Sequence, residues 1–207
     1  MSKIILATTS KYKKQLFGRL NLTFAASAAN ICETPRSGEG AASAAKRLAY
    51  EKAHKIANSV KDCLIIGADQ CAQCGDKLVF KPGSHEQAVA ELSAYSGRSV
   101  DFYTSVCVLT PDGGNEQFTN KTVVHFRTLT QQEIDAYLRI EQPYDCAGAF
   151  KAEGLGISLF RSIETTDPTA IIGLPLIQLS QALRDLGFDC YSASSGAISS
   201  GPNSSES

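Results

Sequence analysis

The chain alternates between short apolar runs and longer segments in which apolar residues recur at helical spacing. Apolar runs such as 63–68 are typical of strands that are buried on both faces of a sheet. The alternating order of the two patterns predicts one α/β domain, which can be divided into two lobes. The predicted strands cover residues 3–7, 22–29, 63–68, 100–109, 119–127 and 157–163, and the predicted helices cover 10–20, 41–60, 84–95, 130–139 and 175–186.

Capping and turn residues set the boundaries of several predicted elements. Ser84 with Gln87, and Thr130 with Glu133, have the spacing of a capping box, which marks the start of a helix. The sequence 110–114, Thr-Pro-Asp-Gly-Gly, is a strong turn signal between two long strand-like segments. These signals predict two well-defined helix starts and one hairpin.

The composition is that of an ordinary globular protein. Hydrophobic residues make up 43% and charged residues 20% of the 207 residues, and the net charge is −1. This charge predicts no general attraction to nucleic acid or to an anionic membrane. No apolar run approaches the roughly 20 residues that span a bilayer, and the apolar segment at the N-terminus is too short for a signal peptide. We therefore expect a cytoplasmic protein without nucleic-acid or membrane partners.

The sequence predicts one domain and a tail. Residues 1–190 are long enough for one sizeable α/β domain, or for two small lobes that share a core. Residues 191–207 have low complexity, are rich in Ser and Gly, and are predicted to be disordered.

The seven cysteines raise the question of a metal or redox site. Cys71 and Cys74 form a Cys-x-x-Cys motif, but zinc needs four protein ligands, or three with a water, and no second motif of this kind is present. A thioredoxin-like pair opens a helix, whereas Gly75 and Asp76 here signal a turn. The residues favour a hairpin with two incidental thiols, and a zinc or redox protein is the weaker alternative.

The start of the first predicted helix combines hydroxyl groups with lysines. Residues 7–14 read Ala-Thr-Thr-Ser-Lys-Tyr-Lys-Lys, and Ser10 is placed to cap the helix. Free backbone N–H groups at a helix start, with hydroxyls and lysines nearby, can bind phosphate. A capped helix with a solvated basic face explains the same residues equally well. The glycines of a P-loop are absent.

Asp69 directly follows an apolar, buried strand. A buried carboxylate needs a cation, a metal ion or hydrogen-bond donors to offset its desolvation, so a functional role is favoured over a turn-stabilising one. Four other polar clusters, each taken alone, are readily explained as charged surfaces or turns. They are Glu33 and Arg36 in one loop, Arg47 with Glu51 and Lys52, Lys81 before a Pro-Gly turn, and the segment 147–154 with Lys151 and Glu153.

Taken together, the clusters supply the groups that phosphoryl chemistry on a nucleotide requires. Lysines and a hydroxyl-lined helix start can neutralise phosphates, and carboxylates can hold a divalent ion or activate water. The spacing of the clusters leaves phosphoryl transfer, hydrolysis and simple binding open.

A series of short motifs runs in order through residues 3–188. They are LATTSKYKKQLF, ETPR, RLAYEKA, IIGADQ, KP, SGR, FYTSV, VHFRTLTQQEIDAYL, CAGAFKAEGLG and IIGLPL. This series resembles the Maf family of nucleoside triphosphate pyrophosphatases. Tyr12, Gln70 and Glu153 resemble the branch that acts on 7-methylguanosine triphosphate (7-methyl-GTP), rather than the branch that acts on dTTP or UTP.

The resemblance implies a fold and a reaction. The implied fold is a mixed α/β (α+β) fold like that of inosine triphosphatase and the Maf and HAM proteins, with an elongated mixed sheet, two lobes and a deep cleft. The implied reaction is hydrolysis between the α- and β-phosphates with Mg²⁺ or Mn²⁺, which releases a monophosphate and pyrophosphate. The nucleoside triphosphate is the implied partner, and family members are often homodimers.

The resemblance also implies a role for individual residues. Asp69 would accept the proton of the attacking water, and Glu33 would help Asp69 to bind the metal. A methylated, cationic guanine would stack well on an aromatic ring, and a carboxylate can accept hydrogen bonds from the guanine N1–H and N2–H₂ groups. The residues implied to hold the triphosphate are Thr8, Ser10, Lys13, Lys52 and Lys81, and those implied to read the base are Tyr12, Gln70 and Glu153.

Two residues depart from the family pattern. Lys13 stands where the family usually has arginine, which keeps the charge but loses the bidentate fork for phosphate. Thr8 stands where the family usually has serine and retains the hydroxyl. The alternatives are a dTTP/UTP pyrophosphatase of the same family, or a catalytically weak nucleotide-binding regulator of cell division. Asp69 and Glu33, both retained, favour an enzyme over the regulator.

Overall fold

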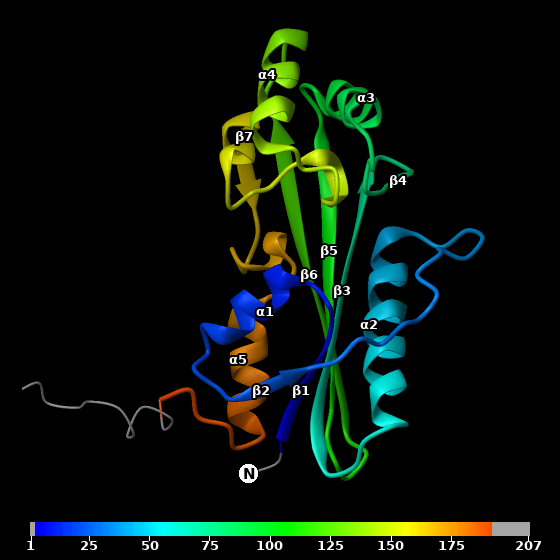
Figure 1. The fold of residues 1–207 in the computed structure, drawn as a ribbon, viewed down its shortest axis with the longest axis vertical. Helices are drawn as coiled ribbons and strands as arrows, with labels where there is room; N and C mark the ends of the chain where they lie inside the picture. The colour runs from blue at the N-terminus through cyan, green and yellow to red at the C-terminus, as the bar shows by residue number, and fades with distance from the viewer. Residues whose placement is uncertain (1–2, 192–207) are drawn as a thin grey trace, which may run out of the picture.

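The protein is elongated and is built along one long, twisted β-sheet (Figure 1). Its structure is a computed structural model that describes residues 3–191. The predicted tail therefore lies, apart from its first residue, outside the described residues. The strands are β1 (Lys3–Ala7), β2 (Phe24–Ala26), β3 (Cys63–Cys74), β4 (Lys77–Val79), β5 (Ser99–Leu109), β6 (Asn115–Phe126) and β7 (Phe160–Glu164).

Five α-helices and three short 3₁₀ helices complete the described fold. The α-helices are α1 (Lys11–Gly18), α2 (Ala41–Ala57), α3 (His85–Tyr95), α4 (Gln131–Glu141) and α5 (Leu176–Asp185). The 3₁₀ helices are η1 (Ala147–Ala149), η2 (Leu155–Leu159) and η3 (Ala170–Ile172). In the part of the chain that the structure describes, no helix is both long and apolar enough to cross a bilayer.

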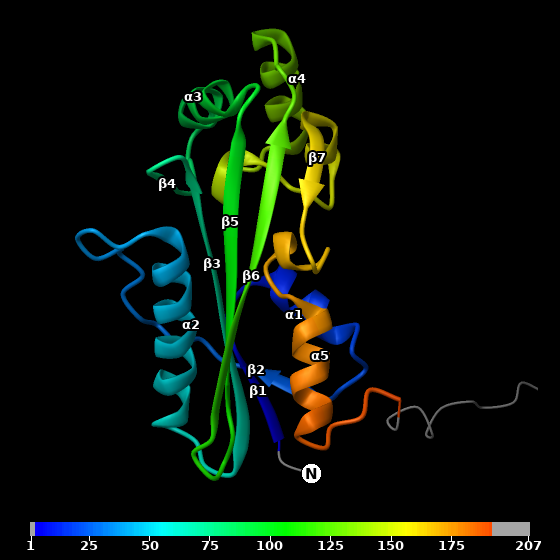
Figure 2. The ribbon, with the colours of Figure 1, turned by 180° about the vertical axis from the view of Figure 1, so that it is seen from behind.

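The sheet is mixed, and its strand order is β2-β1-β3-β5-β6-β7. Strand β1 pairs in parallel with β2 and β3, whereas β3, β5, β6 and β7 pair antiparallel in sequence. Strand β4 pairs with the far end of β3 on the same edge as β1. The three long strands β3, β5 and β6 run the length of the molecule and join its two ends (Figures 1 and 2).

The helices cover the sheet differently at its two ends. Helix α2 lies on one face of the end that contains β1, and α1 and α5 lie on the other face (Figures 1 and 2). Helices α3 and α4 pack on the opposite end, where a separate core contains Leu92, Phe102, Phe126 and Leu138. These two ends are the two lobes of the fold.

Glycine lets α2 approach the sheet closely. A Cβ atom at Gly67 in β3 would overlap the backbone carbonyl of Ala49 and would lie 2.7 Å from the backbone nitrogen of Ala53. Both alanines are fully buried. The small residues of α2 and β3 therefore allow the two backbones to approach closely at Gly67, two residues before Asp69.

Most predicted elements are confirmed, with differences at their ends. Strand β3 does not stop at Ala68 but continues to Cys74, so that Asp69 lies inside a strand rather than after one. The reason is that the antiparallel pairing with β5 continues to Gln73. The strand expected over 157–163 begins only at Phe160, because the residues before it form η2.

The capping predictions are confirmed at α4 and half confirmed at α3. Thr130 and Glu133 form both hydrogen bonds of a capping box. The Ser84 hydroxyl accepts a hydrogen bond from the Gln87 N–H, which is one of the two bonds expected there. The hairpin after Cys74 is confirmed, since Gly75 adopts a φ of 59° and β4 follows. Cys71 and Cys74 are free thiols.

Candidate active site

The cleft opens where one edge of β3 has no neighbouring strand. Pairing with β1 ends at Gly67, and pairing with β4 begins at Ala72. Residues 68–71 lie between these two ends, and a cleft of about 1200 Å³ surrounds them. It is lined by every residue for which the sequence predicted a role, namely Thr8, Ser10, Tyr12, Lys13, Glu33, Lys52, Asp69, Gln70, Lys81 and Glu153. The fold therefore brings together residues from six separate segments.

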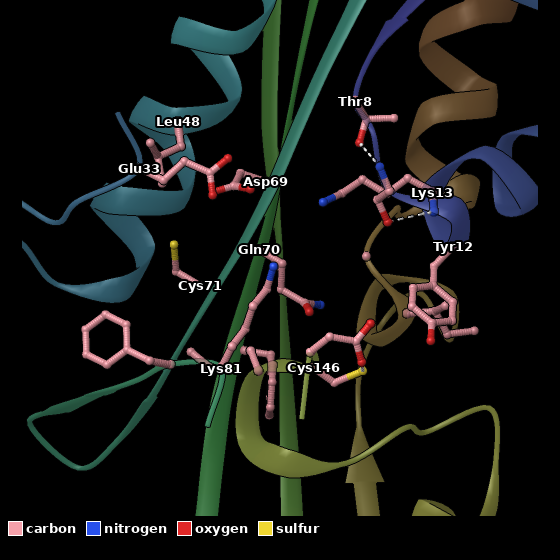
Figure 3. A pocket seen from close by; sticks show the side chains of 18 of the residues that line it. Thr8, Tyr12, Lys13, Glu33, Leu48, Asp69, Gln70, Cys71, Lys81 and Cys146 are labelled. Carbon is pink, nitrogen blue, oxygen red and sulfur yellow. Dashed lines mark hydrogen bonds between the residues drawn. The ribbon is translucent and has the colours of Figure 1, made fainter. Parts of the chain in front are cut away.

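Asp69 and Gln70 point to opposite sides of β3, because successive residues of a strand alternate. Figure 3 shows Asp69 on the side of Glu33, and Thr8, Tyr12 and Lys13 on the other side. The cleft thus reaches around the open edge of the sheet and gives a ligand access to both side chains.

Lys52 joins the two acidic residues of the cleft. Its Nζ lies 2.8 Å from Asp69 Oδ1 and 2.6 Å from Glu33 Oε1. The side chains of Lys52 and Asp69 are only 13% and 11% exposed. Burial opposes the charge of Lys52, but Asp69 and Glu33 outweigh it and raise the pKa of this lysine above its ordinary value. Asp69 is therefore paired with a charged lysine at contact distance.

The loop that carries Glu33 is tied to α2 by Arg47. The Arg47 guanidinium contacts the Glu39 carboxylate at 2.7 Å through two nitrogens, and it also donates to the Thr34 carbonyl at 3.3 Å. The predicted Arg47–Glu51 pair is confirmed at 3.1 Å. Arg47 is only 13% exposed, so the interpretation of this cluster as an ordinary charged helix surface is wrong. These contacts of Arg47 hold the loop that carries Glu33 beside Lys52.

The start of α1 forms the opposite wall. The Thr8 hydroxyl accepts from the Ser10 N–H at 3.1 Å, and Ser10 caps the helix by accepting from the Lys13 N–H at 3.4 Å. Burial lowers the pKa of Lys13 below its ordinary value, and the neighbouring Asp69 opposes this change. Lysines 13, 52 and 81 all line the cleft.

Gln70 is held by hydrogen bonds within the protein. Its Nε2 donates to Thr104 Oγ1 at 2.9 Å and lies 2.9 Å and 3.1 Å from the carbonyl oxygens of Ala170 and Ile171. These contacts use the N–H groups of the amide, so that the carbonyl oxygen is the group left to contact a ligand. In this arrangement Gln70 can only accept a hydrogen bond from a base.

An aromatic and acidic region lies at the other end of the cleft from Glu33. Burial, followed by the proximity of Cys146, Asp145 and Glu153, raises the pKa of Tyr12 to about 12. The tyrosine is therefore neutral at physiological pH and lies next to two carboxylates. This region suits a flat, electron-poor ligand group.

These features describe a cleft with a lysine-rich region and an aromatic, acidic region, and comparison with known proteins assigns the chain to a family. The model of the family described as Maf-like protein matches residues 3–186. The chain belongs to the Maf family.

Two relatives are similar to this Maf protein in sequence over nearly its whole length. A 7-methyl-GTP pyrophosphatase of Cupriavidus metallidurans is 44% identical over 92% of this chain and 96% of its own length. A protein of the same name from Xanthomonas oryzae pv. oryzae is 46% identical over 91% of this chain and 98% of its own length.

A solved structure supports the fold. The Ham1 protein of Staphylococcus aureus is similar to this Maf protein with a TM-score of 0.52 and 13% sequence identity, over 90% of this chain and 100% of that chain. The predicted fold, a mixed sheet of the Maf and HAM type, is confirmed.

Several cleft residues of this Maf protein had no predicted role. They are, among others, Cys71, Phe80, Asp145, Cys146 and the segment Ile171–Gly173. Two signals point to some of them, since CAGAFKAEGLG begins at Cys146 and IIGLPL begins at Ile171. Asp145 and Phe80 have no comparable signal, because only the tertiary fold places them beside the cleft.

Glu33 and Asp69 are the acidic residues of the cleft that could hold a divalent ion. No group of three or more His, Cys, Asp or Glu side chains forms a ready metal site within residues 3–191. Mg²⁺ is commonly held by one or two carboxylates together with substrate phosphates. The two carboxylates, which already converge on the cationic Lys52 Nζ, fit an ion that arrives with a polyphosphate.

Proposed function

We propose that this Maf protein is a nucleoside triphosphate pyrophosphatase that hydrolyses 7-methyl-GTP to 7-methyl-GMP and pyrophosphate. The observation that carries the proposal is the division of the cleft into two regions. Lys13, Lys52 and Lys81 provide positive charge for a triphosphate, whereas Tyr12 and Glu153 provide an aromatic ring and a carboxylate for a base. The names of the relatives described above point to the same substrate.

Asp69 is proposed to accept the proton of the attacking water. Asp69 pairs with Lys52 at 2.8 Å, and its backbone is held by pairing with β5 on one edge of β3. Lys13 and Lys81 would neutralise the triphosphate, whose charge builds up on the leaving pyrophosphate. Glu33 and Asp69 would hold Mg²⁺ or Mn²⁺, and a bound ion would neutralise the phosphates and orient them.

Base selection is proposed to follow from charge and hydrogen-bond direction. A 7-methylated guanine is cationic and would be attracted to the ring of Tyr12 and to the nearby carboxylates of Asp145 and Glu153. The free carbonyl oxygen of Gln70 and the carboxylate of Glu153 accept hydrogen bonds, which matches the N1–H and N2–H₂ donors of guanine. Unmethylated GTP lacks the positive charge and should bind less well.

The direct test is pyrophosphate release from a panel that contains 7-methyl-GTP, GTP, dTTP and UTP, with Mg²⁺ or Mn²⁺. We expect 7-methyl-GTP to have the highest kcat/KM. Strong turnover of dTTP or UTP, with none of 7-methyl-GTP, would reject the proposed specificity. Tight binding without any turnover would identify a nucleotide-binding regulator instead.

The proposed base is tested by Asp69→Asn, which preserves the shape of the side chain. We expect kcat to fall by at least about 100-fold, as for removal of a general base. The matched control is Asp76→Asn in the exposed turn after β3, which should retain full activity. An Asp69→Asn protein with more than a tenth of the wild-type kcat would reject the role of Asp69.

The cellular compartment and the oligomeric state of the protein are also part of the proposal. A nucleotide-pool enzyme would act in the cytoplasm, and a homodimer is the proposed assembly. Sedimentation of the purified protein measures the second point directly.

A further inference from the structure

The segment that carries Lys81 is bracketed by hydrogen bonds to a distant loop. On one side of Lys81, the Phe80 carbonyl accepts from the Gly148 N–H at 3.3 Å. On its other side, the Gly83 N–H donates to the Tyr144 carbonyl at 3.0 Å. Pro82 has no N–H and fixes its own φ, so little freedom remains between the two contacts. The backbone position of Lys81 is therefore set by the segment 144–148.

The side chain of Tyr144 adds a third connection. Its hydroxyl lies 3.0 Å from Nδ1 of His85, the first residue of α3, and 3.4 Å from the Leu138 carbonyl in α4. The carbonyl can only accept, so the single hydroxyl proton is directed to Leu138, and the imidazole donates through Nδ1–H. The Tyr144 and His85 rings also pack edge to face, with 6.1 Å between the ring centroids. One hydroxyl thus links the start of α3 and the last turn of α4 to the loop that brackets Lys81.

The same loop reaches the proposed base region. Asp145 and Cys146 line the cleft, and Figure 3 shows Cys146 and Lys81 at the same end of it. Cys146 and Asp145 also lie close enough to Tyr12 to affect its ionisation. A displacement of residues 144–148 would therefore move Lys81 and the surroundings of Tyr12 together.

We propose that Tyr144 is a positioning residue, whose hydroxyl fixes the loop 144–148 against the segment 80–85 and so holds Lys81 in place to bind the substrate polyphosphate. Tyr144 itself does not line the cleft. It acts through Lys81 and the backbone contacts on both sides of it. This inference rests on the proposed function, because that function assigns a polyphosphate to Lys81.

The test is a double-mutant cycle of Tyr144→Phe and Lys81→Met, with the dissociation constant of inorganic tripolyphosphate measured by calorimetry at fixed magnesium. Tyr144→Phe removes only the hydroxyl, and we expect it to weaken binding by about fivefold, the effect of one or two lost hydrogen bonds. In the Lys81→Met background the same substitution should change binding by less than about twofold, because the residue being positioned is gone.

Two outcomes would overturn the inference. The first is a Tyr144→Phe protein that binds tripolyphosphate as tightly as the wild type. The second is a double variant whose dissociation constant rises by the product of the two single-variant factors, as expected if Tyr144 only contributes to stability. Tyr103→Phe is the matched control, since it removes a hydroxyl that contacts Asp101 at 3.4 Å outside the cleft, and it should leave binding unchanged.

The binding measurement separates this inference from the proposed function. If the wild-type protein binds tripolyphosphate but releases pyrophosphate from no nucleotide, the proposed function fails while the cycle still tests Tyr144. If the wild-type protein does not bind tripolyphosphate, Lys81 has no polyphosphate to hold and the inference is rejected. Where turnover occurs, kcat/KM for the nucleotide should show the same non-additivity.

Discussion

At the scale of single residues, Lys52 decides the charge balance of the cleft. One ammonium group contacts both Glu33 and Asp69, although the sequence suggested that Lys52 would contact phosphate. A lysine and a divalent ion cannot both lie at contact distance from the same carboxylate oxygens without repulsion. Lys52 would therefore compete with the proposed metal, and phosphate groups, which attract both cations, would relieve this competition.

This competition predicts the effect of Lys52→Met on metal binding. The substitution nearly keeps the length of the side chain and removes the charge. Mn²⁺ should therefore bind without nucleotide about tenfold more tightly or better, since the repulsion between a unit charge and a divalent ion at about 4 Å is about 2 kcal/mol even in water. Electron paramagnetic resonance of free Mn²⁺ measures the dissociation constant.

The control for this prediction is Lys55→Met, an exposed position on the same helix, which should leave Mn²⁺ binding unchanged. Equal Mn²⁺ affinity of the wild-type and Lys52→Met proteins would show that Lys52 does not compete with the ion. Thermal unfolding of each variant checks that the carboxylates remain in a folded cleft.

At the scale of secondary-structure elements, the close contact between α2 and β3 positions the catalytic candidates. Lys52 comes from α2 and Asp69 from β3, and Gly67 is the residue that allows the two backbones to approach. The register of β3 then places Asp69 two residues beyond this contact, where β1 has ended. A change in helix–sheet spacing would therefore be transmitted directly to the Lys52–Asp69 pair.

The contact predicts a large effect of Gly67→Ala. The new methyl group would overlap the backbone of α2, which cannot move like a flexible side chain, so the free energy of unfolding should fall by about 3 kcal/mol. Urea unfolding followed by circular dichroism measures this change. Activity should fall as well, because α2 carries Lys52.

Gly18→Ala is the matched control for Gly67→Ala. Gly18 ends α1, and a Cβ atom there would meet nothing within 4 Å. This variant should be as stable as the wild type, or more stable by up to about 1 kcal/mol. If Gly67→Ala and Gly18→Ala have the same stability, the close approach of α2 to β3 is not a constraint on the fold.

At the scale of the whole molecule, the two lobes share strands rather than a linker. Strand β5 contributes Val100 and Phe102 to the core under α3 and α4, and Val106 and Val108 to the core beside α1 and α5. Strands β3 and β6 also extend through both lobes. If one lobe unfolds, the strands of the other lose part of their pairing.

The shared strands predict a single cooperative unfolding transition. The calorimetric enthalpy should equal the van't Hoff enthalpy, because neither lobe can unfold while the long strands remain paired. The measurement requires a reducing agent, since all seven cysteines are free and could form disulfides between unfolded chains. Two resolved transitions in the scan would indicate lobes that fold independently.

The sequence by itself determined the order and kind of most elements, the family and the list of candidate site residues. Periodicity, caps such as Thr130 and turns such as the one at Gly75 are local signals, because they depend on contacts between residues close in the chain. The motif series adds residues whose roles no local pattern explains. Their proposed roles remain predictions.

Only the tertiary structure decided how these residues meet. It showed that Asp69 lies inside β3 at the gap between β1 and β4, that Lys52 bridges two acids, and that the amide nitrogen of Gln70 is already engaged. It also placed Tyr144 beside the Lys81 segment. Each of these facts depends on strand register or on contacts between residues far apart in sequence, and these are set by packing of the whole chain rather than by any local pattern.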